Sequence, residues 1–325
     1  MRTLTLAVLL AATAAAAQDV TIKMGTLAPQ GSTWHSILKD LAEKWSETSG
    51  GKVKLKIYAG GTQGSEGDMV RKMGINQLQA ASITDVGLHD IVEEPMVFSA
   101  PGMVDESTVG ALLPKVQEQM EKRLDEKGYV ALTWAKVGTI NIFCTKAYAT
   151  PEAVAKEAKF FAWDGDPGSI EAFKAINWRP VVLASTDIVP SLQTGMINCV
   201  AQVPAYVLTG RLFEKANKMV DYPWSYLVGA TVVKKDTWEK VPADLRPKLI
   251  AQARELGKKI DAEAKRVNDD AIAEMKKQGL EVVKVEPAKW DAAAENARKT
   301  MRGKVVPAAF FDTVEQLRKE ARGQK

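Results

Sequence analysis

The amino-acid sequence predicts a mixed α/β protein with two lobes. Its length of 325 residues suits two domains of ordinary size. Short apolar runs alternate with longer amphipathic ones, which is typical of a sheet that helices cover on both faces. One long amphipathic helix is expected late in the chain. These observations predict a two-lobed fold with a helix long enough to cross both lobes.

The first strand and helix elements begin at residue 20. VTIKMGTL predicts a strand, and STWHSILKDLAEKWSETSGG predicts a helix that begins at Ser32 and ends at Gly50 and Gly51. KVKLKIYAG alternates with period two and predicts a second strand. The Gly-rich segment GGTQGSEG is interpreted as a turn into a helix over residues 65–73, and QLQAASI as the next strand.

A second series is predicted from YVALTWA and GTINIFCT, through the helix SIEAFKAI, to the apolar strand MINCVAQV. Residues 243–278 then form the long helix, whose apolar residues lie on one stripe: Leu245, Leu249, Leu256, Ile260, Val267 and Met275. At 1.5 Å per residue it would be roughly 50 Å long, so it either bridges the lobes or bends at Gly257. GLEVVKV predicts a late strand, and the C-terminal tail is predicted to be helical.

No internal repeat or low-complexity linker separates the lobes, so we expect them to interleave. The expected division is a signal peptide at 1–17, lobe I at 18–137 with about 221–255 returning to it, lobe II at 138–220 with about 256–300 returning to it, and a C-terminal helical tail at 301–325.

The N-terminal segment has the pattern of a secretory signal peptide. Arg2 is the only charged residue before Asp19, and an apolar run leads to small residues at Ala15 and Ala17, after which cleavage is expected. The Leu- and Val-rich part spans about ten residues, whereas a membrane-spanning helix needs about 20. We therefore expect export to the periplasm, and loss of Arg2 lowers the formal charge from +4 to +3.

The charge pattern and the two cysteines indicate which partners and which redox compartment to expect. The 44 basic and 40 acidic residues are mixed along the chain without a basic block, so a nucleic-acid partner is not expected. Cys144 and Cys199 both lie in apolar, strand-like segments. An oxidising compartment permits a disulfide between them, and two buried free thiols fit the sequence equally well.

No catalytic or metal-ligating constellation stands out. His35 and His89 are not in a metal-ligand spacing, no GxSxG motif is present, and no His lies near the cysteines to activate them. DGDPGS fits the calcium loop of an EF-hand poorly, and we interpret it as a turn with Asp166 as the N-cap of a helix that Pro167 opens. We therefore expect neither an enzyme nor a bound metal or cofactor.

Four segments, in this order, resemble the DctP-type solute-binding proteins of tripartite ATP-independent periplasmic (TRAP) transporters. They are IKMGTLAPQGSTWHSILKDLAEKWSETSGGKVKLKIYAGG, GTQGSEGDMVRKM, LQAASITDVGLHDIVEEPMVFSAPGM and DIVPSLQTGMINCVAQVP. The resemblance covers Asp19 to about Pro307. It implies two α/β lobes that close on one small-molecule solute, and a pair of integral membrane permease subunits that receives the loaded protein. It implies no ATPase. A monomer is expected, and a dimer is left open.

The sequence departs from the family where the ligand is held. Most members bind an organic carboxylate with an Arg on a cleft strand of lobe II, and the matching segment here is KFFAW, which puts Phe161 or Ala162 at that position. A further Arg of some members falls on Ile140. An organic anion would leave its charge poorly compensated in such a cleft, whereas burial of apolar surface is favourable. We therefore predict a ligand with substantial hydrophobic or aromatic area.

The residues predicted to bind this ligand come from both lobes. They are Thr26, Thr84, Ile140, Phe161, Trp163, Gln202, Tyr206 and Trp224. Two alternatives stay open. Trp163 could pack beneath the DGDP turn instead, and Lys136 or Arg179 could supply a displaced cation for a small organic acid.

Overall fold

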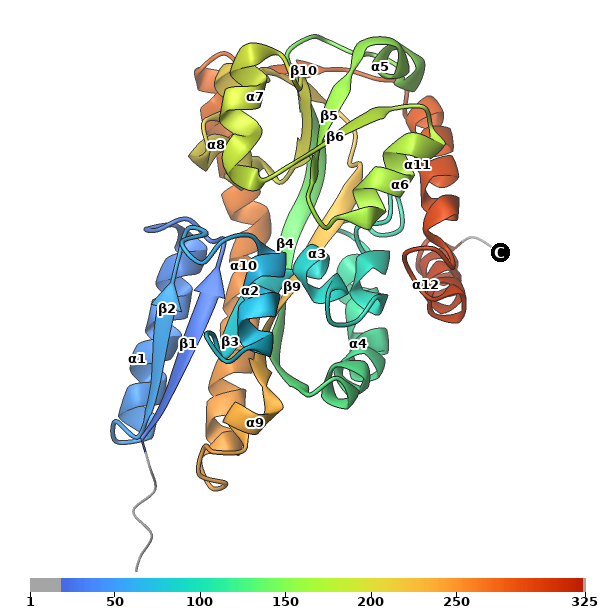
Figure 1. Ribbon diagram of the computed structural model, residues 1–325. Coiled ribbons are helices and arrows are strands. Elements are labelled where there is room, and N and C mark those ends of the chain that lie inside the picture. Colours follow the sequence, from blue (N-terminus) through green and yellow to red (C-terminus); the bar gives the residue numbers. More distant parts are fainter. Residues whose placement is uncertain (1–18, 324–325) are drawn as a thin grey trace, which may run out of the picture.

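A ten-stranded sheet runs through the molecule (Figure 1). The computed structural model describes residues 19–323, so the predicted signal peptide lies outside the described residues. The main strand order is β2–β1–β3–β9–β4–β7–β5–β6, with β8 and β10 attached beside β4. The strands are β1 (Val20–Thr26), β2 (Val53–Tyr58), β3 (Ala80–Thr84), β4 (Tyr129–Cys144), β5 (Lys159–Trp163), β6 (Arg179–Leu183), β7 (Cys199–Gln202), β8 (Lys218–Val220), β9 (Ser225–Lys234) and β10 (Glu281–Val283).

Lobe I contains the first half of the sheet, where β1 pairs in parallel with β2 and β3. Helix α1 (Thr33–Thr48) begins where the Ser32 hydroxyl accepts from the His35 backbone N–H, as the sequence predicts. Its buried side chains lie four residues apart, as an amphipathic helix against a sheet requires, at Ile37, Leu41 and Trp45. The predicted helix after the Gly-rich turn is α2 (Glu66–Gly74), capped by Ser65.

Lobe II contains the other half of the sheet, in which β5 pairs in parallel with β6 and β7. Helix α6 (Pro167–Ala175) has Asp166 as its N-cap, whose side chain accepts from the Ser169 backbone N–H at 2.9 Å, and Pro167 is its first residue. The interpretation of DGDP as a helix-capping turn is therefore confirmed. Short helices α7 (Ile188–Thr194) and α8 (Pro204–Thr209) complete this lobe beside α5 (Pro151–Glu157).

Strand β4 joins the two halves of the sheet. Residues 129–140 pair antiparallel with β9, and residues 141–144 pair with β7. The two strands predicted at YVALTWA and GTINIFCT are thus one strand, whose register shifts between Lys136 and Gly138. Gly138 has φ +139°, and a Cβ there would lie 2.3 Å from the Asn268 amide nitrogen, so only glycine suits this irregularity.

Two long elements were not predicted. Strand β9 lies between β3 and β4, and nearly all of it is buried, which explains its unbroken apolar sequence SYLVGATVV. Helix α4 (Val109–Glu126) carries Pro114 in its first two turns and packs on β4. Apolar runs without period-2 alternation do not distinguish a buried strand from a buried helix.

Helix α10 (Arg246–Lys277) runs without interruption along both lobes, seen in orange in Figure 1. It contacts α1 in lobe I, α8 in lobe II and β4 between them. Of the two readings of the long helix, the one that bridges the lobes is therefore correct. Gly257 marks the closest approach to β4, because a Cβ there would lie 2.1 Å from the Thr133 hydroxyl oxygen and 2.5 Å from the Trp134 carbonyl oxygen.

Gly257→Ala is expected to lower the free energy of unfolding by about 1–3 kcal/mol, because the added methyl group overpacks the contact of α10 with β4. Helix propensity alone would predict a gain of about 1 kcal/mol. Gly110→Ala in α4 is the matched control, since a Cβ at Gly110 meets no atom within 4 Å. Urea unfolding of both variants checks the prediction, and equal effects of the two would contradict it.

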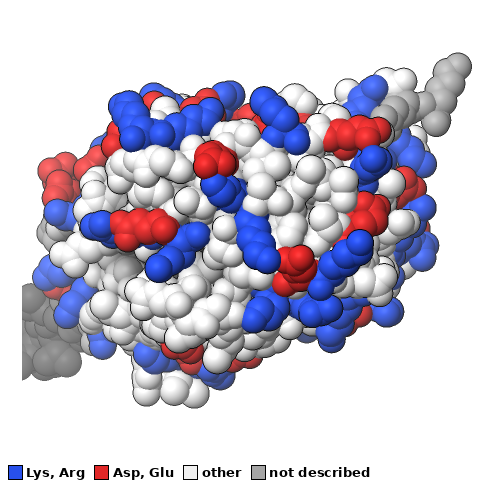
Figure 2. Space-filling view, turned by 90° about the horizontal axis from the view of Figure 1, so that it is seen from above, with Lys and Arg blue, Asp and Glu red and all other residues white. Residues whose placement is uncertain are grey.

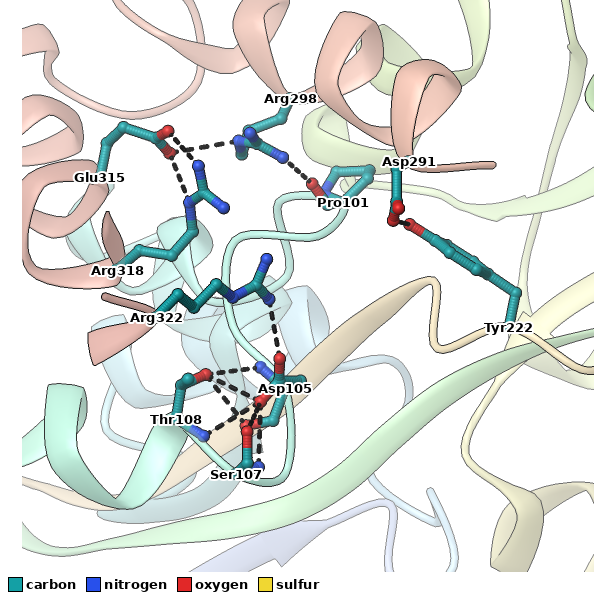
Figure 3. A network of polar contacts seen from close by, with 10 residues as sticks. All are labelled: Pro101, Asp105, Ser107, Thr108, Tyr222, Asp291, Arg298, Glu315, Arg318 and Arg322. Carbon is teal, nitrogen blue, oxygen red and sulfur yellow. Dashed lines mark hydrogen bonds and ion pairs between the residues drawn. The ribbon is translucent and has the colours of Figure 1, made fainter. Parts of the chain in front are cut away.

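The last two helices lie at one side of the molecule, in red at the right of Figure 1, and contact both lobes. Helix α11 (Pro287–Met301) packs on α6 of lobe II, and α12 (Ala308–Ala321) packs on α4 of lobe I. Figure 3 shows the polar contacts between these helices and the loop after Pro101. The C-terminal helices therefore connect the lobes on the side away from the chain's first strands.

Cys144 and Cys199 form a disulfide between directly paired positions of β4 and β7. Both residues are fully buried. Of the two alternatives that the sequence left open, the structure therefore has the disulfide. It closes a loop with a sequence separation of 55 residues, which includes β5 and β6.

Charges of both signs are interspersed over the lobe II end of the molecule (Figure 2). The view from above shows Lys and Arg beside Asp and Glu around broad uncharged areas, as the mixed charge pattern of the sequence predicts. Within residues 19–323, no helix combines the length and the apolar character needed to cross a membrane. The same residues contain no group of three or more His, Cys, Asp or Glu placed to hold a metal ion.

Candidate ligand-binding site

Three adjoining cavities lie between the lobes. The inner cavity has a volume of about 30 Å³, the apolar cavity about 130 Å³ and the outer cavity about 640 Å³. Trp163 lines all three. Gln202 lines both the inner and the apolar cavity, and Tyr206 lines both the apolar and the outer cavity. The shared walls show that the three cavities are parts of one cleft.

The cleft lies at the carboxyl ends of parallel strands. Thr26 and Thr84 are the last residues of β1 and β3 in lobe I, and Trp163 and Gln202 are the last residues of β5 and β7 in lobe II. Open α/β sheets place their ligand sites in crevices at this edge. Each lobe therefore presents its strand ends to the same space.

All eight residues predicted to bind the ligand line these cavities. Thr26, Thr84 and Tyr206 line the apolar cavity; Ile140, Phe161 and Trp224 line the inner cavity; Trp163 and Gln202 line both. The structure thus brings together, in one cleft, side chains that lie up to about two hundred residues apart in the sequence.

Two of these residues belong mainly to the core. Phe161 is 3% exposed and packs in the lobe II core, edge-on to Trp163 with 5.8 Å between ring centroids. Trp224 is also 3% exposed and stacks on Trp178 at 4.9 Å. Both reach the inner cavity from behind, whereas Trp163 faces it and its two neighbours. The reading in which Trp163 only supports the DGDP turn does not account for this position.

Among the cleft residues that sequence reasoning missed are an aromatic one and an acidic one. Trp34, in the first turn of α1, lines the apolar cavity, and Glu66, at the start of α2, lines the apolar and outer cavities. Acidic residues are common in the first turn of a helix, so Glu66 gave no signal. A tryptophan two residues after the helix cap Ser32, beside a Gly–Ser turn, is the signal that could have indicated Trp34.

Glu66 is held by lobe I. Its carboxylate accepts from the Thr84 backbone N–H at 2.9 Å, the Thr84 hydroxyl at 2.7 Å and the Gly87 backbone N–H at 3.0 Å. These bonds also fix the Thr84 side chain, because its hydroxyl donates to Glu66. Burial raises the pKa of Glu66 although its hydrogen bonds act in the opposite direction.

Two further carboxyl groups are buried next to Glu66. Asp85, the first residue of α3 (Asp85–His89), is fully buried, and neither of its oxygens has a partner of good hydrogen-bond geometry among residues 19–323; the nearby Ser99 hydroxyl, which donates to the Met96 carbonyl oxygen, favours the ionised form only weakly. Burial raises the pKa of Asp85 well above its usual range, and nearby Asp166 and Glu66 raise it further. Burial also raises the pKa of Asp166, which lines the inner cavity. The interior of the cleft is therefore surrounded by acidic groups.

Asp85→Asn is expected to stabilise the protein at pH 7–8 and to change little near pH 4. Because the pKa of Asp85 is higher in the folded state, the folded protein binds this proton more tightly than the unfolded chain does. The stability from this group is complete below the unfolded pKa and is lost as pH rises through the folded pKa. At neutral pH we expect a gain of about 1–3 kcal/mol. Urea unfolding at both pH values checks this; a variant with an unchanged pH profile would contradict it.

Positive charge is scarce in the cleft. Of the described residues that line the three cavities, Arg71 is the one with a cationic side chain; it lines the outer cavity and pairs with Asp68. Lys136 lies 3.8 Å from the Asp261 carboxylate, and Arg179 donates to the Lys156 carbonyl oxygen on the surface. Neither is among the residues that line the three cavities.

Residues 24–304 match the family of bacterial extracellular solute-binding proteins, family 7, also called DctP. The chain belongs to this family. The predicted resemblance to DctP-type TRAP solute-binding proteins is thereby confirmed, and so is the prediction that the protein is not an enzyme, because family 7 proteins bind solutes. TRAP solute-binding proteins bind small molecules and work with membrane permease subunits.

Relatives of this family 7 protein share its length and fold. A solute-binding protein of Roseobacter denitrificans is 23% identical over 305 residues, which cover 89% of both chains. A TRAP periplasmic solute-binding protein of Ralstonia eutropha, solved with bound (S)-2-acetolactate, superposes with a TM-score of 0.85 at 20% identity and covers 92% of this chain and 99% of that one.

The corresponding protein of Citrobacter koseri, solved with bound D-glucuronate, gives a TM-score of 0.82 at 21% identity, over 90% of this chain and 98% of that chain. These likenesses confirm the predicted two-lobed α/β fold. Both bound molecules carry a carboxylate. In this protein, the described residues that line the inner and apolar cavities include no cationic side chain that could pair with one.

Proposed function

We propose that this protein is the periplasmic component of a TRAP transporter and that it binds a ligand with substantial hydrophobic or aromatic area in the cleft. The observation that carries this proposal is the apolar cavity, whose exposed wall is mostly apolar and which has no cationic side chain among its described lining residues. The mature chain would begin at Gln18 and deliver its ligand to the membrane permease subunits as a monomer.

The wall of the apolar cavity favours an apolar surface on the ligand. Lobe I contributes Leu27, Trp34 and Ile83, lobe II contributes Tyr206, and Ile260 of α10 lies between them. Each square ångström of apolar surface removed from water contributes roughly 25 cal/mol. A ligand that buries about 100 Å² of such surface would gain about 2.5 kcal/mol from this wall alone.

The carboxyl groups around the cleft do not favour an anion. Glu66 lines the apolar cavity, Asp166 lines the inner one, and Asp85 is buried beside both. A carboxylate placed among them would raise its own pKa and theirs, since like charges in a desolvated site disfavour the ionised forms. An uncharged ligand avoids this cost.

Two buried N–H groups indicate a polar atom on the ligand. The indole nitrogens of Trp34 and Trp163 are buried and have no acceptor among the described residues. An unsatisfied buried donor costs about 1–3 kcal/mol. A carbonyl or ether oxygen on the ligand would satisfy such a donor.

Mass spectrometry of the small molecules released from purified protein tests the proposal, together with fluorescence titration of the neutral aromatic probe N-phenyl-1-naphthylamine. We expect saturable binding of the probe and its competition by the released molecule. D-glucuronate is the comparison ligand and should not compete. A hydrophilic acid released from the cleft, with no binding of the probe, would refute the hydrophobic ligand.

The second candidate is a small organic acid, which the ligands of the two solved relatives favour. Its cation would have to be Arg71 at the outer cavity, released from Asp68. Arg71→Gln would then abolish calorimetric binding of D-glucuronate. Arg211→Gln is the control, because Arg211 forms a similar exposed pair with Glu214 and does not line the cleft cavities. If the wild type binds no acid in an organic-acid screen, this candidate is excluded.

A further inference from the structure

A fourth cavity, of about 430 Å³, lies where the lobes meet the C-terminal helices. We call it the hinge cavity. Gly102 and Asp105 of lobe I, Tyr222 and Pro223 before β9, and side chains of α11 and α12 line it. It shares no described lining residue with the three cleft cavities. We propose that the hinge cavity binds a compact oxyanion, such as phosphate or a small carboxylate.

Three arginines line this cavity, and two of them are unusually buried. Arg298 is 7% exposed and Arg318 8% exposed, and Arg322 lies next to them one turn beyond Arg318. Figure 3 shows the three guanidinium groups gathered on one side of the network. Arginine is almost never this buried unless its charge is paired.

The pairing leaves positive charge in excess at the buried end. Arg298 Nε lies 3.3 Å from Glu315 Oε2, and Arg318 donates to both oxygens of the same carboxylate at 3.1 and 2.6 Å. Two cations thus share one anion. The other contact of Arg298 is with the neutral Pro101 carbonyl oxygen at 2.8 Å. Burial lowers the pKa of Arg298; Glu315 and Glu295 act in the opposite direction, and repulsion from Arg318 and Arg322 lowers it further.

The other carboxylates that face the cavity already have partners. Asp105 accepts from Arg322 at 2.7 Å and from the backbone N–H groups of Ser107 and Thr108 at 3.0 Å. Asp291, on the far side in Figure 3, accepts from the Tyr222 hydroxyl at 2.7 Å. Glu295 pairs with Lys299 at 2.6 Å. None of these three carboxylates forms a hydrogen bond or ion pair with Arg298 or Arg318, although Glu295 lies near enough to favour the charged form of Arg298.

Donors remain for a ligand. Among residues 19–323, Arg298 Nη2, Arg318 Nη1 and Arg322 Nη1 donate to no acceptor. Guanidinium groups recognise oxyanions through pairs of parallel N–H···O bonds, and such charge-assisted bonds are stronger in a desolvated site. The cavity volume is many times the share of one water molecule, about 30 Å³, so a compact oxyanion fits.

Isothermal titration calorimetry of the full mature protein at constant ionic strength tests the site, with inorganic phosphate, succinate and chloride as separate probes. We expect saturable binding of one molecule of phosphate or succinate per chain, and none of chloride. Arg318→Gln and Arg322→Gln should each weaken that binding by about tenfold or more, as loss of a charge-assisted hydrogen bond predicts.

Arg302→Gln is the matched control, because Arg302 forms a bidentate pair with Asp312 at the exposed start of α12 and does not line the cavity. It should leave oxyanion binding unchanged. If Arg318→Gln does not fold, Arg322→Gln at the rim still tests the site. Absence of saturable binding to phosphate and succinate, or equal weakening by all three substitutions, would overturn the proposal. Binding of the neutral probe in the cleft reports separately on the proposed function.

Discussion

Trp163→Ala is expected to weaken ligand binding in the cleft by about 100-fold. Trp163 ends β5 and lines the inner, apolar and outer cavities, so its indole ring contacts a ligand wherever that ligand lies in the cleft. Loss of half of an indole surface of about 200 Å² removes about 2.5 kcal/mol of apolar contact. Fluorescence titration with N-phenyl-1-naphthylamine measures the effect.

Two further substitutions separate the contributions of Trp163. Trp163→Phe keeps most of the aromatic surface and removes the N–H, so we expect a smaller loss for the hydrocarbon-like probe and a larger one for a ligand that carries a carbonyl oxygen. Val182→Ala on the exposed surface of β6 is the control for non-specific effects. Probe binding to Trp163→Ala with wild-type affinity would show that the ligand lies elsewhere.

Replacement of both Cys144 and Cys199 by Ala is expected to lower the free energy of unfolding by about 4 kcal/mol. A crosslink over 55 residues restricts the unfolded chain by about this amount in the loop-entropy model. Alanine suits both positions because they are fully buried among apolar side chains, where a serine hydroxyl would add a desolvation cost. Urea unfolding of the oxidised wild type and the double variant measures the difference.

Addition of dithiothreitol distinguishes the crosslink from the loss of side-chain packing. It should lower the stability of the wild type and leave the double variant unchanged. We also expect the loss to affect lobe II first, since the loop closed by the disulfide contains β5 and β6. Equal sensitivity of both proteins to the reductant would contradict the assignment.

The strand ends of the site could be predicted from the sequence, because local patterns determine them. Period-2 alternation and the following turns place Thr26 and Thr84 at the ends of strands, and the Asp166 cap fixes where β5 stops at Trp163. Long-range pairing has no such local signal. The position of β9 between β3 and β4, and the direct pairing of Cys144 with Cys199, depend on contacts between distant segments.

Phe161 shows a second limit of predicting a binding site from the sequence. The family comparison placed it where an arginine would hold a carboxylate, and it does line the inner cavity, yet its ring fills the core of lobe II. Sequence alone could not decide how much of a side chain at the end of a strand faces the core and how much faces the cleft. Glu66 and Trp34 were missed for a related reason, because both lie on helices whose local patterns are ordinary.

The uninterrupted course of α10 and β4 has a mechanical consequence. Loops alone do not join the lobes, so any opening and closing of the lobes would bend a helix and a strand that run through both. Bending such an element costs elastic energy, and this energy adds to the free-energy difference between the open and closed states. Every 1.4 kcal/mol of that difference changes the apparent affinity tenfold. Substitutions along α10, far from any ligand, are therefore expected to tune affinity by changing stiffness.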